Sequence, residues 1–380
     1  MIPIALPLLD ESEADAAREA VLSGWVSQGP QVAAFEREFA AMVDAPFACA
    51  VSNCTTALHL ALIAANVGTG DEVITTSHSF IATANCIRYC GATPVFVDID
   101  PETYNIDPVR VAEAITPRTR AILAVHQMGM PCDLGALTAL AKKHDLILIE
   151  DAACAVGSEI RISEQWDRIG KPHGDIACFS FHPRKVITTG EGGMLTTSNP
   201  EFDGKFRLLR QHGMSVPDTV RHGSPQVIFE DYLVVGYNYR MTDMQAAVGR
   251  KQLTKLSDIV SRRRALAAGY TELLGNIEGL SLPFEPDWAR SNWQSYCVRL
   301  PSGVDQKAVM QGLLDQGIAT RRGIMCSHRE APYLNGAPRH ELRQSEAAQD
   351  HSILLPIYAQ MAEKDLAYVA DKLKAELQRN

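Results

Sequence analysis

The sequence has no long uninterrupted run of apolar residues. A membrane-spanning helix needs about 18 of them in succession, and the two longest apolar stretches, 58–67 and 146–156, are broken by His59, Glu150 and Asp151. Hydrophobic residues nevertheless make up 46% of the chain, which is enough for a large buried core. We therefore expect a globular protein with no membrane partner.

An excess of basic residues is also absent. The 36 Lys and Arg residues are outnumbered by 45 Asp and Glu residues, which gives a net charge of −9. Proteins that bind nucleic acid normally carry the opposite sign or at least a basic stripe, so nucleic acid is not an expected partner. The first residues turn acidic by position 10 and show neither the basic region nor the cleavage site of a signal peptide. We expect a cytoplasmic location.

The nine cysteines include no CxxC pair, and the eleven histidines include no HExxH motif. Disulfide frameworks and zinc sites show even or closely spaced patterns of these residues. An odd number of cysteines scattered through apolar segments is typical of reduced, buried thiols. The sequence therefore predicts neither disulfides nor a metal site.

What the sequence does contain is an alternation of short apolar runs with helical periodicity. The predicted strands are 47–51, 72–76, 94–98, 121–126 and 146–150, and helical patterns over 55–65, 79–89, 108–115 and 134–144 lie between them. Strands in such an alternation are parallel and joined by helical crossovers. Two further strands, 176–181 and 194–197, meet at a glycine-rich turn and should be neighbours. This pattern predicts an α/β sheet domain, preceded by a helix over 11–22 that Asp10 caps.

A long helix over 242–274 is predicted to lead the chain away from this sheet. The pattern of a smaller α+β unit follows, with a strand over 294–300, a helix over 306–316, a strand over 317–321 and a last helix from Ala362. We place the boundary near residue 255, which gives domains 1–255 and 256–380. The cleft between two closely packed domains is the natural place for a ligand site.

Three segments could carry chemistry, although each has an ordinary structural explanation. Residues 52–57, SNCTTA, follow a strand and open a helix, so they suit an anion, yet Ser, Thr and Asn are also common helix caps. Asp151 ends a strand where α/β folds gather their ligands, but an isolated Asp is more often a cap. Lys185 follows a strand within a loop of aromatic and apolar residues. Most lysines are solvated, but here burial is expected to lower the pKa of the amine and make it a nucleophile.

Taken together and in chain order, these segments resemble a known family. The strings SGWVSQGP, SNCTTALHLAL, SFIATAN, IEDAA, SFHPRKVITTGEGGM and GYNYRMTDMQAAVG are similar to the motifs of the DegT/DnrJ/EryC1/StrS sugar aminotransferases. The resemblance covers most of the chain. It implies a fold-type I pyridoxal phosphate enzyme, with a large, mainly parallel seven-stranded sheet domain and a smaller C-terminal α+β domain.

The resemblance also implies a role for each matching residue. Lys185 would be the Schiff-base lysine that moves a proton during catalysis, and Asp151 would pair with the pyridine nitrogen of the cofactor. The remaining cofactor contacts would come from the phosphate-binding residues Thr55, Thr56 and Ser180, the ring-stacking residue Phe80, and Asn238, which would reach the phosphate from the neighbouring subunit. The protein would then be a homodimer with active sites at the subunit interface. His126, His182 and Arg240 also match the family, and we expect structural roles for them.

The chain departs from the family pattern at several positions. Cys154 stands where the family usually has His or Gln to contact the phenolic oxygen of the cofactor, and a thiol is a weak donor. Cys54 replaces a common glycine. The segment TRRGIMCSHREAPY differs from the family's proline-containing loop, but His328 matches its active-site histidine. Arg321 or Arg322 would face an anionic substrate.

The implied activity is transfer of an amino group, with L-glutamate as donor and a nucleotide-diphosphate-linked keto sugar as acceptor. SGWVSQGP is closer to members that aminate C4, which favours a 4-keto-6-deoxy sugar, and Lys185 argues against the dehydratases that carry histidine there. A 3-keto sugar or a keto-cyclitol is an alternative substrate. A non-catalytic regulatory protein that binds pyridoxal phosphate is another possible reading. A nicotinamide oxidoreductase is disfavoured because no GxGxxG follows the early strands.

Overall fold

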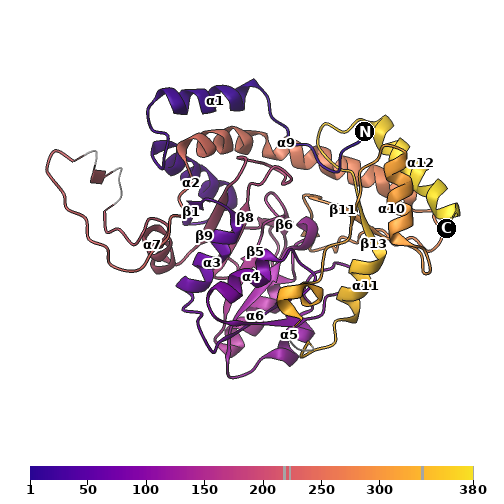
Figure 1. Cartoon of the computed structure of the whole chain (residues 1–380), viewed down its shortest axis with the longest axis horizontal. Helices are drawn as coiled ribbons and strands as arrows, with labels where there is room; N and C mark the ends of the chain where they lie inside the picture. The colour runs from indigo at the N-terminus through magenta and orange to yellow at the C-terminus, as the bar shows by residue number, and fades with distance from the viewer. Residues whose placement is uncertain (217–219, 222–223, 335–337, 380) are drawn as a thin grey trace.

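The structure is a computed structural model that describes residues 1–216, 220–221, 224–334 and 338–379. A seven-stranded sheet forms the centre of its larger part (Figure 1). The strand order is β1 (Phe47–Val51), β9 (Gly193–Thr197), β8 (Ile176–Ser180), β5 (Ile147–Asp151), β4 (Thr119–Val125), β2 (Glu72–Thr76) and β3 (Thr93–Val97). All neighbours are parallel from β8 to β3, while β9 is antiparallel to both β1 and β8. The predicted mainly parallel sheet and the adjacency of β8 and β9 are confirmed.

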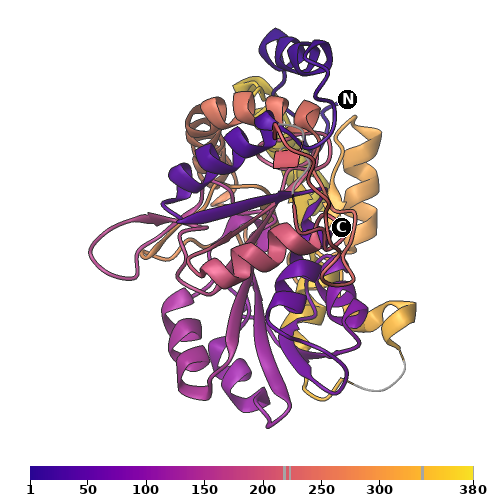
Figure 2. The same ribbon diagram turned by 90° about the vertical axis from the view of Figure 1, so that its left-hand side faces the viewer.

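Helices cover both faces of this sheet (Figure 2). One face packs against α3 (Cys54–Ala64), α4 (Ala82–Tyr89) and α7 (Pro200–Leu209), and the other against α2 (Pro30–Val43), α5 (Pro108–Ala114) and α6 (Leu134–His144). Successive strand residues point to opposite faces, so Ile122 and Leu123 are both fully buried but belong to different cores. This double burial is why the strands appear in the sequence as continuous apolar runs.

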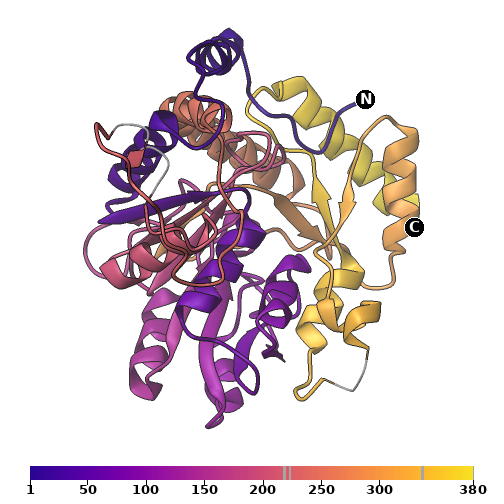
Figure 3. The same ribbon diagram turned by 60° about the vertical axis from the view of Figure 1, so that its left-hand side comes forward.

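The helix α9 (Asp243–Leu274) runs from this part of the molecule to a second core, with α1 (Glu11–Leu22) packed along its first half (Figure 1). The smaller unit, seen at one side in Figure 3, contains a sheet of β11 (Tyr296–Arg299), β13 (Ser352–Leu355) and β12 (Arg321–Arg322) with α10 (Gln306–Asp315), α11 (Arg343–His351) and α12 (Glu363–Arg379). A short sheet of β10 (Ala289–Arg290), β6 (Glu159–Ile160) and β7 (Asp167–Arg168) joins the two parts. Three single 3₁₀ turns cover Gln127–Gly129, Ser327–Arg329 and Ala331–Tyr333.

The predicted domain boundary near residue 255 falls inside α9. Leu256 on this helix packs in the core of the large sheet, whereas Leu266 and Tyr270 pack in the core of the smaller unit. One continuous helix therefore contributes to both cores, and the position of the boundary stays a prediction.

The predicted strand over 317–321 is wrong in its extent, because regular strand structure begins only at Arg321. Gly317 adopts a left-handed φ of 77°, and the next residues pair with the start of the chain instead. Ile2 donates to the carbonyl of Gly317 and accepts from the amide of Ala319. The elements α7, α11 and β13 were not predicted. None of the helices that the structure describes is long and apolar enough to cross a membrane.

Candidate active site

The predicted chemical residues meet where β5 and β8 end and α3 begins. Asp151 is the last residue of β5 and lies opposite Cys178 of β8, whose last residue is Ser180. The thiol of Cys54, the first residue of α3, donates to the carbonyl of Cys178 at 3.6 Å. These contacts place one carboxylate and the start of a helix at the same edge of the sheet, where parallel α/β folds bind their ligands.

Lys185 lies at this edge, in the turn that follows β8. Its Nζ donates to the Sγ of Cys154 at 3.0 Å. Burial alone would lower the pKa of Lys185, but the charge and the hydrogen bond of Cys154 raise it, with smaller contributions from Cys54 and Asp151, and the net direction is upward. The expected lowering of the lysine pKa is therefore wrong for this structure, because a neighbouring sulfur outweighs the loss of water.

Asp151 is buried, and hydrogen bonds orient its carboxylate. Oδ2 accepts from the hydroxyl of Thr83 at 2.8 Å, and Oδ1 accepts from the amide of Ala153 at 3.2 Å. Burial raises the pKa of Asp151, and these hydrogen bonds and the nearby Lys185 oppose the rise only in part. Thr83 also pairs with Ser79, hydroxyl to hydroxyl at 2.8 Å. Sequence reasoning missed Thr83, although it lies within the SFIATAN motif.

Behind Asp151, a buried His–Glu pair supports the end of β5. The amide of Cys132 donates to Nδ1 of His126 at 2.9 Å, so Nδ1 carries no proton and Nε2 donates to Glu150, also at 2.9 Å. The amide of His126 bonds to the carbonyl of Asp151 at 3.1 Å. Both ring nitrogens are occupied, which fits the structural role expected for His126.

The first turn of α3 has free amide groups. Asn53 caps the helix, since its Oδ1 accepts from the amide of Thr56 at 2.9 Å, and the hydroxyl of Thr56 donates to the carbonyl of Asn53 at 2.7 Å. Within the described residues, the amides of Cys54 and Thr55 meet no protein acceptor. A Cβ on Gly193 of β9 would lie 2.5 Å from the carbonyl of Asn53, so only glycine allows this close approach. The free amides at a helix N-terminus suit an anion such as phosphate.

The structure describes the surroundings of three other predicted cofactor residues. Ser180 is buried at 8% exposure, whereas Phe80 is 63% exposed. Asn238 is exposed, and its Oδ1 accepts from Arg240 at 3.2 Å. The amide of Ser52 donates to the carbonyl of Tyr239 at 2.8 Å, which holds the GYNYR segment beside the start of α3.

The two predicted substrate residues lie in the smaller unit. His328 bridges the parts of the molecule, since its Nδ1 lies 2.7 Å from the hydroxyl of Ser77, just after β2, and its Nε2 lies 3.1 Å from Glu346 of α11. Arg321 is exposed on β12 and makes no side-chain ion pair within the described part of the chain.

Two buried amide side chains that sequence reasoning missed tie the active-site turns together. The Nδ2 of Asn292 donates to the carbonyls of Cys154 and Val156, both at 2.8 Å, and Gln294 donates to the carbonyl of Arg184. Both residues lie just before β11, far from the motifs in the sequence. The turns that carry Cys154 and Lys185 are thus held by one short segment.

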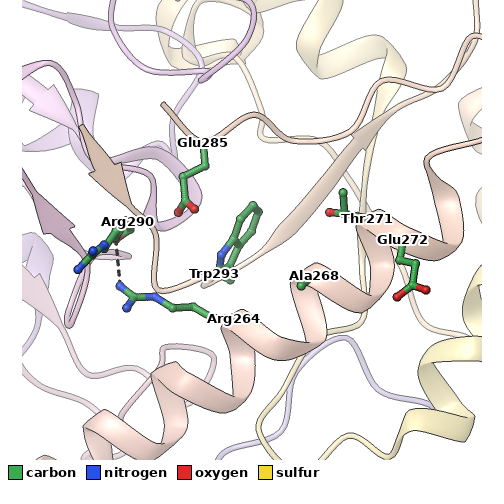
Figure 4. A pocket seen from close by; sticks show the side chains of 7 residues that line it. All are labelled: Arg264, Ala268, Thr271, Glu272, Glu285, Arg290 and Trp293. Carbon is green, nitrogen blue, oxygen red and sulfur yellow. Dashed lines mark hydrogen bonds between the residues drawn. The ribbon is translucent and has the colours of Figure 1, made fainter. Parts of the chain in front are cut away.

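A cavity next to Trp293 is lined by none of the candidate site residues. It has a volume of about 640 Å³ and is lined by Arg264, Ala268, Thr271, Glu272, Glu285, Arg290 and Trp293 (Figure 4). In Figure 4, Arg264 points to the backbone of Arg290, to which it donates at 3.4 Å. Two arginines and two glutamates balance in charge, and the hydroxyl of Thr271 is hydrogen-bonded to the carbonyl of Ala267 and the hydroxyl of Tyr296. We assign no chemistry to this cavity.

The donor set at the sheet edge fits pyridoxal 5'-phosphate. The cofactor needs a carboxylate for its ring nitrogen, hydrogen-bond donors for its phosphate and a lysine amine for its aldehyde. Asp151, the free amides of α3 and Lys185 supply one of each. Fold and site together define a pyridoxal phosphate enzyme of fold type I.

The chain belongs to the DegT/DnrJ/EryC1/StrS aminotransferase family, whose model matches residues 7–374. The sugar aminotransferases of this family are pyridoxal phosphate-dependent transaminases, and the protein is an enzyme of that class.

Named relatives and solved structures resemble the chain over nearly its whole length. It is 39% identical over 379 residues to the spore coat polysaccharide biosynthesis protein SpsC of Bacillus subtilis, covering 98% of this chain and 96% of that protein. It is 39% identical to the GDP-perosamine synthase of Caulobacter vibrioides, covering 96% and 95%. The structure of a putative sugar aminotransferase, Spr1654 from Streptococcus pneumoniae in its PMP form, matches with a TM-score of 0.93 at 26% identity and covers 100% of both chains.

Proposed function

We propose that the protein is a homodimeric aminotransferase that moves the amino group of L-glutamate to a nucleotide-diphosphate-linked keto sugar, with a 4-keto-6-deoxy sugar as the preferred acceptor. The observation that carries this proposal is the meeting of the Lys185 amine, the Asp151 carboxylate and the free amides of α3 at one edge of the sheet.

Each of these groups has a distinct task. When bound, pyridoxal phosphate supplies an electron sink for the carbon that loses its proton. Asp151 keeps the ring nitrogen protonated, because an adjacent carboxylate favours the charged form. The amides of Cys54 and Thr55 and the hydroxyls of Thr55 and Ser180 bind the phosphate. The exposed ring of Phe80 is available to stack on the cofactor.

Lys185 is the catalytic acid and base. With the cofactor bound, Lys185 would hold it through its Nζ, and the same amine would take a proton from the substrate carbon and return it during the transfer of the amino group. The turn that carries Lys185 is held by Gln294 through the carbonyl of Arg184, so the amine keeps its position during this transfer.

Two observations favour a nucleotide-linked sugar as acceptor. The name of one relative, GDP-perosamine synthase, includes a nucleoside diphosphate. In this chain, Arg321 is an exposed cation without an ion pair within the described residues, as expected of a group that binds an anion. His328 lies closer to the sheet, between Ser77 and Glu346, and would contact the sugar.

The dimer would complete the site. Asn238 is exposed and would reach the phosphate bound to the partner subunit. The chain around it also exposes several large apolar side chains, at 63–89% exposure: Val227, Phe229, Tyr232, Leu233 and Val235. Contiguous exposed apolar residues mark interaction surfaces, and a second copy of this chain would bury these.

An absorption spectrum tests the first half of the proposal. We expect purified protein to show the band of lysine-bound cofactor and to lose it on addition of L-glutamate, whereas Lys185→Met should never show that band. A protein that takes up pyridoxal phosphate but whose spectrum is unchanged by glutamate and by every keto sugar would instead support the regulatory alternative.

Product analysis tests the second half. The protein is first incubated with pyridoxal phosphate and glutamate. It is then mixed, in separate reactions, with a nucleotide-linked 4-keto sugar, a nucleotide-linked 3-keto sugar and a keto-cyclitol. NMR locates the new amine in each product. We expect the amine at C4 of the 4-keto-6-deoxy sugar. Amination of only the 3-keto sugar or the cyclitol would retain the enzyme class and overturn the substrate.

A further inference from the structure

Cys154 differs from the other hydrogen-bonded cysteines in the described structure because its partner is a charged side chain. The thiols of Cys54, Cys86, Cys132 and Cys326 each donate to a backbone carbonyl. The sulfur of Cys154 instead accepts, from the amine of Lys185 at 3.0 Å. A sulfur that accepts a hydrogen bond from a lysine has the environment of a thiolate next to a cation.

The position of this sulfur is fixed by the fold. The carbonyl of Cys154 accepts from Asn292, while Gln294 holds the carbonyl of Arg184 next to Lys185. Asn292 and Gln294 thereby fix the two turns that carry Cys154 and Lys185 relative to each other. Cys154 and Lys185 are each half-buried, so water screens the pair incompletely while small reagents can still reach it.

We propose that Cys154 is a positioning residue for Lys185: before the cofactor is bound, its sulfur accepts a hydrogen bond from the lysine and aims the amine at the cofactor site. The inference rests on the proposed function only in taking Lys185 as the lysine that binds the cofactor.

The charged groups around the pair are consistent with this assignment. Three groups face the amine of Lys185: Cys154 in the turn after β5, Cys54 at the start of α3 and Asp151 at the end of β5. All three raise the pKa of Lys185 and so oppose the effect of burial. Burial keeps Cys54 protonated, because it raises the pKa of that thiol well above its usual value. Asp151 already accepts from Thr83 and Ala153. The sulfur of Cys154 is thus the group within hydrogen-bond distance of the amine.

Alkylation of the full-length, cofactor-free protein tests the pair directly. Iodoacetamide is added at about pH 7, and the modification of each cysteine is followed by mass spectrometry. We expect Cys154 to react fastest and Lys185→Met to slow its reaction roughly tenfold, because the cation that stabilises the thiolate is gone. Lys185→Arg keeps the charge and should keep most of the rate. Cys90 serves as the internal control, since burial raises its pKa to about 11 and it has no cationic partner in the described residues.

The amine side of the pair is tested by the pH profile of cofactor uptake. Cys154→Ser and Cys154→Ala remove the sulfur that most strongly opposes the effect of burial, so the pKa of Lys185 should fall. The rate of pyridoxal phosphate capture should then reach half its maximum at a lower pH than in the unaltered protein. Cys90→Ser is the matched control and should leave the profile unchanged. Far-UV circular dichroism checks that each variant is folded.

The outcomes separate this inference from the proposed function. An alkylation rate of Cys154 that is equal in the unaltered protein and in Lys185→Met, or a capture profile unmoved by loss of the sulfur, would overturn the inference while the enzyme still uses pyridoxal phosphate. Protein that never captures pyridoxal phosphate, but whose Cys154 reacts in a Lys185-dependent way, would overturn the proposed function and retain the pair.

Discussion

The burial of the Asp151 carboxylate costs stability. Burial raises the pKa of Asp151 in the folded chain above its value in the unfolded chain. At a pH between these two values, the folded chain therefore keeps a proton that the unfolded chain has lost. Stability therefore falls as the pH rises through that window, and the loss is complete above it. A buried ionised carboxylate with incomplete compensation is common at sites selected for catalysis rather than for stability.

Asp151→Asn should accordingly separate stability from activity. Without cofactor, we expect the variant to be more stable than the unaltered protein by about 1 kcal/mol at about pH 8, with the difference shrinking as the pH falls. Turnover should fall at least a hundredfold, because an amide cannot keep the ring nitrogen charged. Urea unfolding across pH and an aminotransferase assay measure the two effects.

Asp175→Asn is the matched control for this comparison. Burial raises the pKa of Asp175 too, and its carboxylate bonds to the amide of Leu148 near the opposite end of the strands. Its replacement should move stability in the same direction and leave turnover unchanged. Full turnover in Asp151→Asn would contradict the role given to Asp151.

The hydroxyl of Thr83 should control the pH at which Asp151 works. Its hydrogen bond lowers the pKa of Asp151, so Thr83→Val, which keeps the shape and removes the donor, should raise that pKa. The acidic limb of the profile of kcat/KM against pH should then move to higher pH, whereas Thr83→Ser should restore it. An unmoved limb in Thr83→Val would show that Asp151 does not set it.

At the scale of elements, the close approach of β9 to α3 shapes the proposed phosphate site. A Cβ at Gly193 would meet the backbone of Asn53 at 2.5 Å, so Gly193→Ala must push the first turn of α3 away from the sheet. Such overpacking typically costs about 1–3 kcal/mol, and we expect cofactor affinity to fall at least tenfold in an equilibrium titration. Gly204→Ala in α7, where a Cβ meets open space, should leave affinity unchanged and stabilise the fold by about 0.5 kcal/mol.

Elements with local signals could be predicted from the sequence, and elements with distant partners could not. The helix over 11–22 was predicted with its correct ends because Asp10 caps it through a bond to Ser12. The strand over 317–321 was misplaced because the partner of residues 317–319 is Ile2, at the far end of the chain.

The candidate site follows the same rule. Asp151 and Lys185 were chosen from the family motifs, and their meeting at one edge of the sheet agrees with the convergence of strand ends in a parallel sheet. The orienting hydroxyl of Thr83 and the supporting amides of Asn292 and Gln294 could not be predicted, because they depend on how helices and the second unit pack against that edge. The raised pKa of Lys185 was missed for the same reason, since it needs the 3.0 Å contact with Cys154.

At the scale of the whole molecule, the proposed dimer predicts that each active site needs residues from both chains. If Asn238 serves the site of the partner subunit, Lys185→Ala and Asn238→Ala each damage every site of their own homodimer. A mixed dimer of the two variants, however, has one site that combines an intact Lys185 from one chain with an intact Asn238 from the other.

Co-expression of the two variants with different affinity tags should therefore restore activity. Random pairing of equal amounts gives half mixed dimers, each with one complete site of two, so total activity should reach about a quarter of that of the unaltered protein. Mixed dimers purified through both tags should reach about half. Mixed dimers that stay as inactive as their parents would show that Asn238 acts within its own chain, and the exposed segment of Val227, Phe229, Tyr232, Leu233 and Val235 would then need a different occupant.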